Sequence, residues 1–321
     1  MRTHWIKSLA LAATAASLLI GTPASAETRV TYKSAKSSSS YYQMGVQIAE
    51  AVKRGTDGKI IVTVEESQGS VQNVVEAAHR SGNYVFTTPP ALVNLAIAGK
   101  AMFKDKADPK FADIRALFPI PSLTMHFVVR ADSGIDSFAD LAGKTILLGK
   151  GSFGAKEGAK YLDMFGLKDK VKLANVELSN AVPALKNKQI DGFVTAGSYP
   201  APNVIEAAAG TGIKLLSLSP EQVAETKRDE LIIPAGTYAG VDTDTVTTSL
   251  SVVAYTTTNM DDETAYELTK TYWEQKKKMG AEDPWWKGVT YEMLSNISGK
   301  IHPGALKYYK EAGVKVPASA E

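Results

Sequence analysis

Strand-like and helix-like segments alternate along the first third of the chain, and this alternation restricts the fold more than any other feature. Runs rich in Ile, Val and Tyr are separated by segments whose apolar residues recur at helical spacing. The expected elements are a strand at Thr28–Tyr32, a helix at Ser40–Arg54, a strand at Lys59–Glu65, a helix at Val71–Arg80 and a strand at Tyr84–Phe86. This β-α-β-α-β order predicts a mostly parallel sheet with helices on its faces.

The middle of the chain repeats this alternation, which predicts a second α/β unit. Strands are expected at His126–Arg130, Lys144–Leu148, Asn175–Leu178, Gly192–Thr195 and Lys214–Leu218, and short helices at Ser137–Leu141 and Val182–Lys188. The end of the chain shows a long β-rich segment at Ile232–Thr258 and helices at Asp262–Met279 and Pro284–Ser295.

Two lobes follow from this order, and the first of them is discontinuous. The chain is expected to cross from one lobe to the other near Pro119–Thr124 and to return near Pro234–Val241. We therefore expect lobe I to comprise residues 27–122 plus 238–321, and lobe II to comprise residues 123–237.

The first 26 residues have the pattern of a secretory signal peptide. Arg2 and Lys7 form a positive start, an apolar run extends from about Leu9 to Ile20, and Ala24-Ser25-Ala26 is an A-x-A cleavage site. The alternative is an anchoring helix, but the apolar run is short for a bilayer span and Pro23 closes it. We expect cleavage after Ala26 and export to a bacterial periplasm.

Charge and cysteine content exclude several classes of protein. Arg2 and Lys7 account for the whole formal net charge of +2, so the mature chain is near neutral and lacks the basic excess of a nucleic-acid-binding protein. With 0 cysteines the chain has no disulfide, no thiolate metal site and no Cys nucleophile. His79 and His126 each stand without a second ligand at metal-binding spacing, which favours structural roles.

Small polar residues occupy the places where predicted strands lead into helices. The segments are Ser34–Gly45, Ser67–Asn73 and Gly149–Gly158. Each offers backbone N–H groups that have no partner inside the helix, near the positive end of the helix dipole, and such a place suits a carboxylate or phosphate. Ser40, Ser70 and Ser152 are also ordinary N-cap residues, so capping explains each segment alone. Three such segments in both lobes favour a ligand cleft at the carboxyl ends of the strands.

Catalytic patterns are absent from the sequence. No G-x-S-x-G motif is present, and no G-x-x-x-x-G-K-[ST] phosphate loop, although "GKGSFG" is loosely similar to one.

Arg130 can pair with a ligand or, as a structural alternative, with Asp132. Tyr41 and Tyr42 can each contact a ligand or pack into the core. His302 is expected at a turn into the last helix, and the aromatic residues of Glu282–Lys287 are expected to pack.

Several motifs resemble those of the TAXI family of TRAP-transporter solute receptors. They are "YYQMGVQIAEAV", "QGSVQNVVEA", "VVRADSGIDSFADLAGKTILLGKGSFG", "LKNKQIDGFVTAGSYPAPNVIE", "IPAGTYAGVDTDTVT" and "HPGALKYYKEAGV". The resemblance covers essentially the whole mature chain. Three segments depart from the family pattern: "SAKSSSSYYQMG" replaces a glycine-rich opening, Gly151-Ser152-Phe153-Gly154 replaces Gly-Ser-Gly-Thr, and Thr87-Thr88-Pro89-Pro90 replaces Gln-Ser/Asn-Asp.

The resemblance implies a two-lobed type II periplasmic-binding-protein fold, α/β in class, with hinge strands and an interlobe cleft. It implies a monomeric receptor without cofactor or metal that captures a small solute, with glutamate, glutamine or related dicarboxylates as the associated class, and delivers it to TRAP-type membrane permease subunits. The expected ligand contacts are Ser39, Tyr41, Tyr42, Gly69, Ser70, Asn73, Thr87, Thr88, Ser152, Phe153, Gly154, Thr195, Ser198, Tyr199 and Tyr238.

Two other functions remain open at this point. A ligand-sensing module would present the same closed form to a receptor or histidine kinase in place of a permease. An enzyme is the third alternative, and it is disfavoured because no nucleophile or acid–base pair stands out.

Overall fold

A mixed β-sheet runs through both halves of the molecule. The computed structural model describes residues 27–150 and 152–321, and within them the strands form one 10-stranded sheet with the main order β2-β1-β3-β10-β4-β7-β5-β6. The strands are β1 (Thr28–Lys33), β2 (Ile60–Glu65), β3 (Tyr84–Thr88), β4 (Ile114–Arg130), β5 (Thr145–Leu147), β6 (Lys172–Ala174), β7 (Gly192–Gly197), β8 (Ile213–Leu215), β9 (Asp229–Ile233) and β10 (Thr245–Thr257).

The first half confirms the alternation predicted from the sequence. Strands β1, β2 and β3 are parallel, with β1 between the other two. The helices that connect and follow them are α1 (Ser40–Gly55), α2 (Ser70–Ala77) and α3 (Pro90–Ile97). The sequence reasoning missed α3, which begins at Pro90 because proline is well suited to the first turn of a helix.

The second half has the same architecture around β7, β5 and β6, which are parallel to one another. Its helices are α4 (Phe153–Met164), α5 (Ala181–Lys186), α6 (Pro202–Thr211) and α7 (Pro220–Thr226). The predicted strand at Asn175–Leu178 is wrong. The strand β6 lies just before it and pairs with β5 from Lys172 to Ala174, whereas Leu178–Asn180 forms a 3-10 turn.

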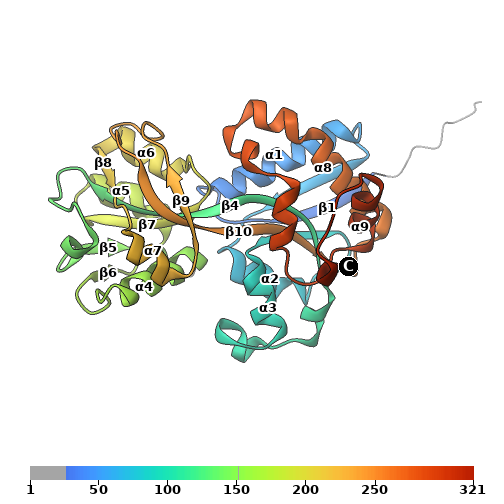
Figure 1. Ribbon diagram of the computed structural model, residues 1–321, viewed down its shortest axis with the longest axis horizontal. Coiled ribbons are helices and arrows are strands. Elements are labelled where there is room, and N and C mark those ends of the chain that lie inside the picture. Colours follow the sequence, from blue (N-terminus) through green and yellow to red (C-terminus); the bar gives the residue numbers. More distant parts are fainter. Residues whose placement is uncertain (1–26, 151) are drawn as a thin grey trace, which may run out of the picture.

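Two long antiparallel strands, β4 and β10, connect the halves (Figure 1). They have 17 and 13 residues, far longer than the three-residue strands β5, β6 and β8. Their register shifts where Leu250 pairs with Leu123 and Val252 pairs with Ile120, so the bulged residues Pro121 and Ser122 lie at the crossing.

The pairing of β10 bears on where the lobes are divided. Its first residues, Thr245 to Ser249, pair with β9 in the second half, and later residues pair with β3 in the first half. We therefore propose that the return crossing lies near Leu250, and that residues 238–249 belong to lobe II together with the loop that contains Tyr238.

The C-terminal segment covers the first half. The helix α8 (Asp262–Glu282) packs against α1 and α9 (Pro303–Glu311). The single helix predicted at Pro284–Ser295 is two 3-10 segments, Pro284–Gly288 and Tyr291–Asn296, because Val289 and Thr290 between them are extended. Trp286 is 0 % exposed, so the aromatic residues here pack as predicted. His302 caps α9, also as predicted.

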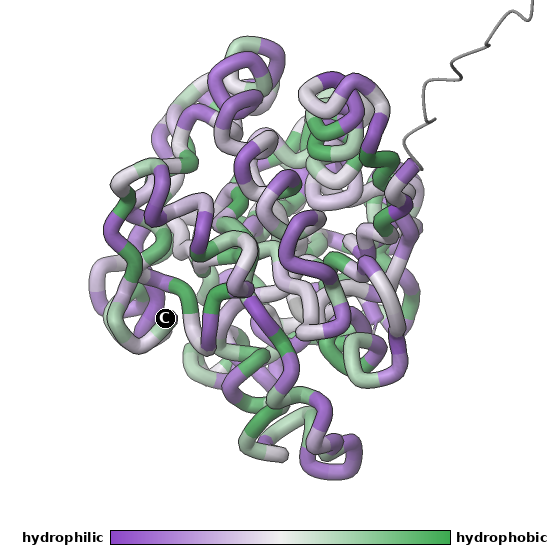
Figure 2. The backbone as a smooth tube through the Cα atoms, turned by 90° about the vertical axis from the view of Figure 1, so that its right-hand side faces the viewer, coloured by the Kyte–Doolittle hydropathy of each residue, from purple (hydrophilic) through white to green (hydrophobic). Residues whose placement is uncertain are grey.

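Hydrophilic and hydrophobic residues are interleaved along the coiled segments of the backbone (Figure 2). Among the helices of the described ranges, none has both the length and the apolar character that a bilayer span requires. The predicted signal peptide, residues 1–26, lies outside the described residues.

A buried histidine joins three segments of the second half. His126 Nδ1 is 3.1 Å from the carbonyl oxygen of Thr124, and its Nε2 is 2.9 Å from the hydroxyl of Tyr238, which accepts a bond from the backbone N–H of Ala201. Burial lowers the pKa of His126 to about 4, against an opposing effect of the Thr124 carbonyl. The neutral ring therefore donates from Nδ1 and accepts the Tyr238 proton at Nε2.

This arrangement predicts a loss of stability in mild acid. The unfolded chain protonates this histidine near pH 6.5 and the folded chain only near pH 4, so the free energy of unfolding falls as the pH drops through that window. At pH 5 the expected loss from His126 is about 2 kcal/mol. Urea denaturation at pH 7 and pH 5 measures it.

The variants His126→Gln and His79→Gln form a matched pair for this experiment. Glutamine does not titrate, so His126→Gln should show a smaller difference between pH 7 and pH 5, whereas replacement of the exposed His79 should leave the difference intact. An equal pH dependence in wild type and His126→Gln would contradict the assignment. Burial also lowers the pKa of His302, so a smaller pH dependence of the free energy of unfolding should remain in His126→Gln.

Candidate ligand-binding site

A small cavity lies between the two halves, at the carboxyl ends of their parallel strands. Its volume is about 70 Å³, room for about five water molecules by the same measure. The first half contributes residues after β1 and β2 and at the end of β3. The second half contributes residues after β5 and β6 and at the end of β7, and Leu123 of β4 lies between them. The lining includes Ser34, Lys36, Ser39, Tyr41, Gln68, Gly69, Ser70, Thr87, Lys150, Ser152, Gly154, Glu177 and Thr195.

The start of α2 forms one wall of the cavity. Gly69 has φ 108°, a conformation that L side chains rarely adopt, and it precedes the first residue of the helix, Ser70. The backbone N–H of Gly69 donates to Ser67 Oγ at 2.9 Å. The next N–H groups, those of the first helical turn, have no partner within the helix and lie beside the cavity.

The helix caps differ in part from the sequence expectation. Ser152 caps α4 as expected, and its Oγ accepts from Ala155 N at 2.9 Å. The cap of α1 is Ser39, which accepts from Tyr41 N at 3.3 Å, and the cap position of α2 is Gly69. Ser40 instead uses its Oγ to accept from the backbone N–H of Ser198 at 3.0 Å, and this bond ties the two halves together.

Close approach of helix α4 to strand β7 forms the opposite wall. A Cβ on Gly154 would lie 2.8 Å from Ala196 Cβ, a distance that real Cβ atoms essentially never show. Glycine at this position therefore allows the N-terminus of α4 to approach the end of β7. Thr195 in the same wall accepts from Asn203 Nδ2 at 3.1 Å.

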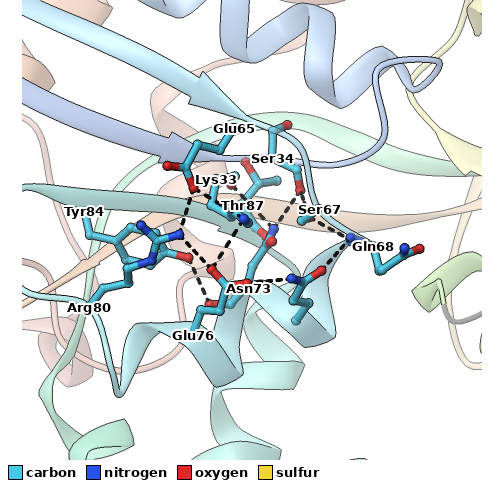
Figure 3. Close-up of polar contacts among 12 residues, drawn as sticks. Lys33, Ser34, Glu65, Ser67, Gln68, Asn73, Glu76, Arg80, Tyr84 and Thr87 are labelled. Atoms are coloured by element: carbon cyan, nitrogen blue, oxygen red, sulfur yellow. Dashed lines mark hydrogen bonds and ion pairs between the residues drawn. The ribbon is translucent and has the colours of Figure 1, made fainter.

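Asn73 holds together the strand ends that border the cavity (Figure 3). It is 0 % exposed, and its Nδ2 donates to Ser34 O at 2.7 Å and to Thr87 O at 2.9 Å. The amide thus ties the ends of β1 and β3 to α2. Among the described residues, Asn73 Oδ1 is the one buried side-chain oxygen or nitrogen without a hydrogen-bond partner.

A network of charged side chains lies behind this wall (Figure 3). Lys33 Nζ, on a side chain only 10 % exposed, is 3.3 Å from Glu65 and 3.5 Å from Glu76. Arg80 contacts the same carboxylates at 2.8 and 3.1 Å and lies over the ring of Tyr84. Burial raises the pKa of Glu76, but hydrogen bonds from Arg80 and Gln72 and the nearby lysine outweigh that effect and lower it.

Gln72 links this network to the cavity. Its Nε2 donates to Glu76, and its Oε1 accepts from the backbone N–H of Gln68 at 2.7 Å. Because Gln68 lines the cavity, the ion pairs fix the loop that follows β2 without placing a charge in the cavity itself.

Three charged side chains do line the cavity. Lys36 comes from the first half, and Lys150 and Glu177 come from the second. Lys36 and Glu177 are half-buried and Lys150 is exposed. The described residues contain no group of three potential metal ligands. This combination of two cations, one carboxylate and free N–H groups suits the binding of a polar, charged small molecule.

The chain as a whole matches one protein family. The model of the NMT1-like family matches residues 33–313. The chain belongs to the NMT1-like family. Several solved structures of low sequence identity are also similar to it.

Two of these structures show the fold of this NMT1-like chain. The periplasmic binding protein BugD is 12% identical, with a TM-score of 0.53, over 91% of this chain and 99% of that chain. A structure from a study of glutathione import through GshT and the cystine ABC importer TcyBC of Streptococcus mutans is 13% identical, with a TM-score of 0.50, over 82% and 96%. The fold is the mixed α/β fold of type II periplasmic binding proteins.

A third structure is less similar. It is a TRAP periplasmic solute-binding protein from Actinobacillus succinogenes with bound L-galactonate, 16% identical with a TM-score of 0.45, over 90% of this chain and 87% of that chain.

The structure brings eight of the predicted contact residues of this NMT1-like protein to the cavity. They are Ser39, Tyr41, Gly69, Ser70, Thr87, Ser152, Gly154 and Thr195. The hydroxyl of Tyr41 is engaged with Pro121 O at 3.0 Å, and that of Thr87 donates to Tyr32 at 2.9 Å. The side chain of Phe153 lies outside the described part of the chain.

The other predicted residues lie elsewhere. Asn73 and Tyr238 are buried in the hydrogen-bond networks described above, and neither Tyr42 nor Thr88 is among the lining residues. Ser198 and Tyr199 face a different space, on the far side of β4. Arg130 pairs with Asp132 at 2.9 Å and donates to Ile190 O at 2.6 Å. Of the two roles expected for Arg130, the structure therefore shows the structural pair with Asp132.

Sequence reasoning missed the charged residues of the cavity. Lys36 and Lys150 stand within the Gly- and Ser-rich loops already singled out, and their position next to the helix starts was the available signal. Glu177 had no such signal, because its segment was predicted to be a strand.

The role of Asn73 predicts a specific pattern of stability. Asn73→Ala removes the donor shared by two strand ends and should lower the free energy of unfolding by about 2 kcal/mol. Asn73→Asp has the same volume, but its carboxylate faces carbonyl oxygens, so it should be the more destabilising change. Urea denaturation measures both, and Asn94→Ala on the exposed face of α3 is the control. If Asn73→Asp were as stable as wild type, the donor role would be incorrect.

Proposed function

We propose that the protein is an extracytoplasmic solute receptor of a TRAP-type secondary transporter. It binds a small carboxylate-bearing solute between its halves and delivers it to the membrane permease. One observation carries this proposal: the carboxyl ends of two sets of parallel strands, one set in each half, border the same cavity. In α/β sheets, this is the place where ligands bind.

The chemistry of the cavity supports a carboxylate in particular. Free N–H groups at the starts of α2 and α4 are donors near positive helix ends, and Lys36 and Lys150 add positive charge. Glu177 provides a partner for an amino group, so a solute with both charges, such as an amino acid, fits the same set. Binding and release, not chemical conversion, is the activity that these groups support.

Entry of a solute requires the halves to move apart. A cavity of about 70 Å³ is smaller than the pockets of roughly 300 Å³ and more that hold drug-sized ligands. The crossing strands β4 and β10 are the connection about which such a movement takes place. A solute that contacts both halves favours the closed arrangement, which a permease can then recognise.

Mass spectrometry of the compound released on denaturing the purified protein tests the function directly. A panel of carboxylates, beginning with L-glutamate, should then raise the melting temperature, since a ligand at a hundredfold excess over its dissociation constant adds about 2.7 kcal/mol. No released solute and no stabilisation by any carboxylate would argue against the proposal.

The substitution Ser70→Asp separates binding from folding. A carboxylate at the start of α2 interacts favourably with the helix dipole, so the ligand-free protein should be at least as stable as wild type. The same charge repels an anionic solute, by about 3 kcal/mol at 5 Å in an effective dielectric of 20, so affinity for the stabilising carboxylate should fall about a hundredfold or more.

The matched control is Ser70→Asn, which has the same shape without the charge. It should keep the affinity within a few-fold of wild type. Calorimetric titration compares the three proteins, and equal affinity of Ser70→Asp and Ser70→Asn would place the carboxylate away from α2.

A further inference from the structure

A second space between the two halves lies on the opposite face of β4. It has a volume of about 450 Å³ and is bordered by Ser122 and Thr124 of β4, whereas Leu123 between them faces the cavity described above. Successive side chains of a strand point to opposite faces, so this groove and the cavity are separated by the crossing strands. We call it the rear groove.

The chemistry of the rear groove differs from that of the cavity. Its walls are apolar and aromatic: Trp285 and Met293 come from the C-terminal segment of the first half, and Tyr199 and Leu231 come from the second half. Among the described residues that border it there is no Asp, Glu, Lys, Arg or His. An ionised ligand would lose hydration here without gaining a partner of opposite charge.

Five residues with hydroxyl groups border the rear groove, and two of them, Ser198 and Thr237, already donate to backbone carbonyls. The hydroxyls of Ser122, Thr124 and Tyr199 make no hydrogen bond with any side chain or backbone group in the described ranges, although the Ser122 carbonyl accepts from Ser198 Oγ at 2.9 Å. Hydroxyl groups of this kind can donate to or accept from one polar atom of a ligand. A groove of this volume with apolar walls and a few polar groups has the character of a small-molecule site.

The aromatic wall is held rigidly in place. Trp285 Nε1 donates to Gln47 Oε1 at 3.0 Å, and Gln47 in turn donates to Asp283 at 2.9 Å. Trp286 donates to the same Gln47 oxygen at 2.6 Å. The indole ring of Trp285 is therefore oriented before any ligand arrives, which reduces the entropy lost on binding.

We propose that the rear groove is a second binding site, for a small neutral aromatic compound with one hydrogen-bonding group. The ligand stacks against Trp285 and Tyr199 and bonds to the hydroxyl groups of β4. Its occupation also affects the cavity, because movement about the crossing strands that widens the front narrows the rear. A ligand in the rear groove thus favours the arrangement in which the front cavity is narrow.

Indole is a suitable probe because it is neutral, aromatic and has a single N–H donor. Calorimetric titration of the full mature chain should give a dissociation constant in the millimolar range or tighter for indole, and at least tenfold weaker binding for indole-3-acetate, which carries a charge. Equal binding of the two compounds, or no binding of indole, would overturn the proposal.

The variant Gly288→Trp locates the site. Gly288 borders the rear groove, a Cβ there meets no atom within 4 Å, and its φ lies outside the region that favours glycine. The added indole side chain should fill the groove and abolish indole binding with little change in melting temperature. Lys287→Trp adds the same side chain at the preceding position, which does not border the groove, and should leave indole binding unchanged. Unchanged binding in Gly288→Trp would place the site elsewhere.

Solution scattering tests the coupling without any carboxylate solute, so its outcome is independent of the proposed transport function. Saturating indole should decrease the radius of gyration of the wild-type protein, and Gly288→Trp should show no response. A radius that is unchanged or larger with indole bound would overturn the coupling. The absence of both a released solute and stabilisation by any carboxylate would instead argue against the proposed function and would not affect the rear-groove proposal.

Discussion

The pairing of β4 with β10 is the interaction on which the other features depend. Each half would be an ordinary α/β unit without it, with its strand ends open to solvent. The two crossing strands set the halves so that the ends of β1, β2 and β3 face the ends of β5, β6 and β7 across one cavity. The bulge at Pro121 and Ser122 lies at the crossing. Leu123 beside it lines the cavity, whereas Ser122 and Thr124 border the rear groove on the opposite face.

Charged side chains have different roles behind the cavity and inside it. Lys33, Arg80, Glu65 and Glu76 neutralise one another in a partly buried network that fixes the loop after β2. Such pairs add little stability, because the cost of removing charges from water offsets most of their attraction. Their main effect is to fix the position of that loop. The cavity itself is lined by the unpaired N–H groups and by Lys36, Lys150 and Glu177.

The order of most elements and the positions of most strand ends were predictable, because apolar periodicity and small polar residues are local signals. Eight of the proposed contacts line the cavity for that reason. The hydrogen-bond partners of each polar side chain were not predictable. Asn73 and Tyr238 stand in suitable segments, but tertiary packing commits them to Ser34, Thr87 and His126. The β6 error has a similar cause, since a three-residue strand is defined by its neighbour β5 more than by its own sequence.

The continuity of the sheet has a consequence for the energetics of closing. The halves share a hydrogen-bonded ladder and are not joined by a flexible linker, so their relative motion is restricted to bending of two paired strands. Under the proposed function, few arrangements are then accessible when the protein is empty, and little configurational freedom is lost when the halves close on a solute. Such a molecule can retain a small solute tightly with only a modest number of contacts.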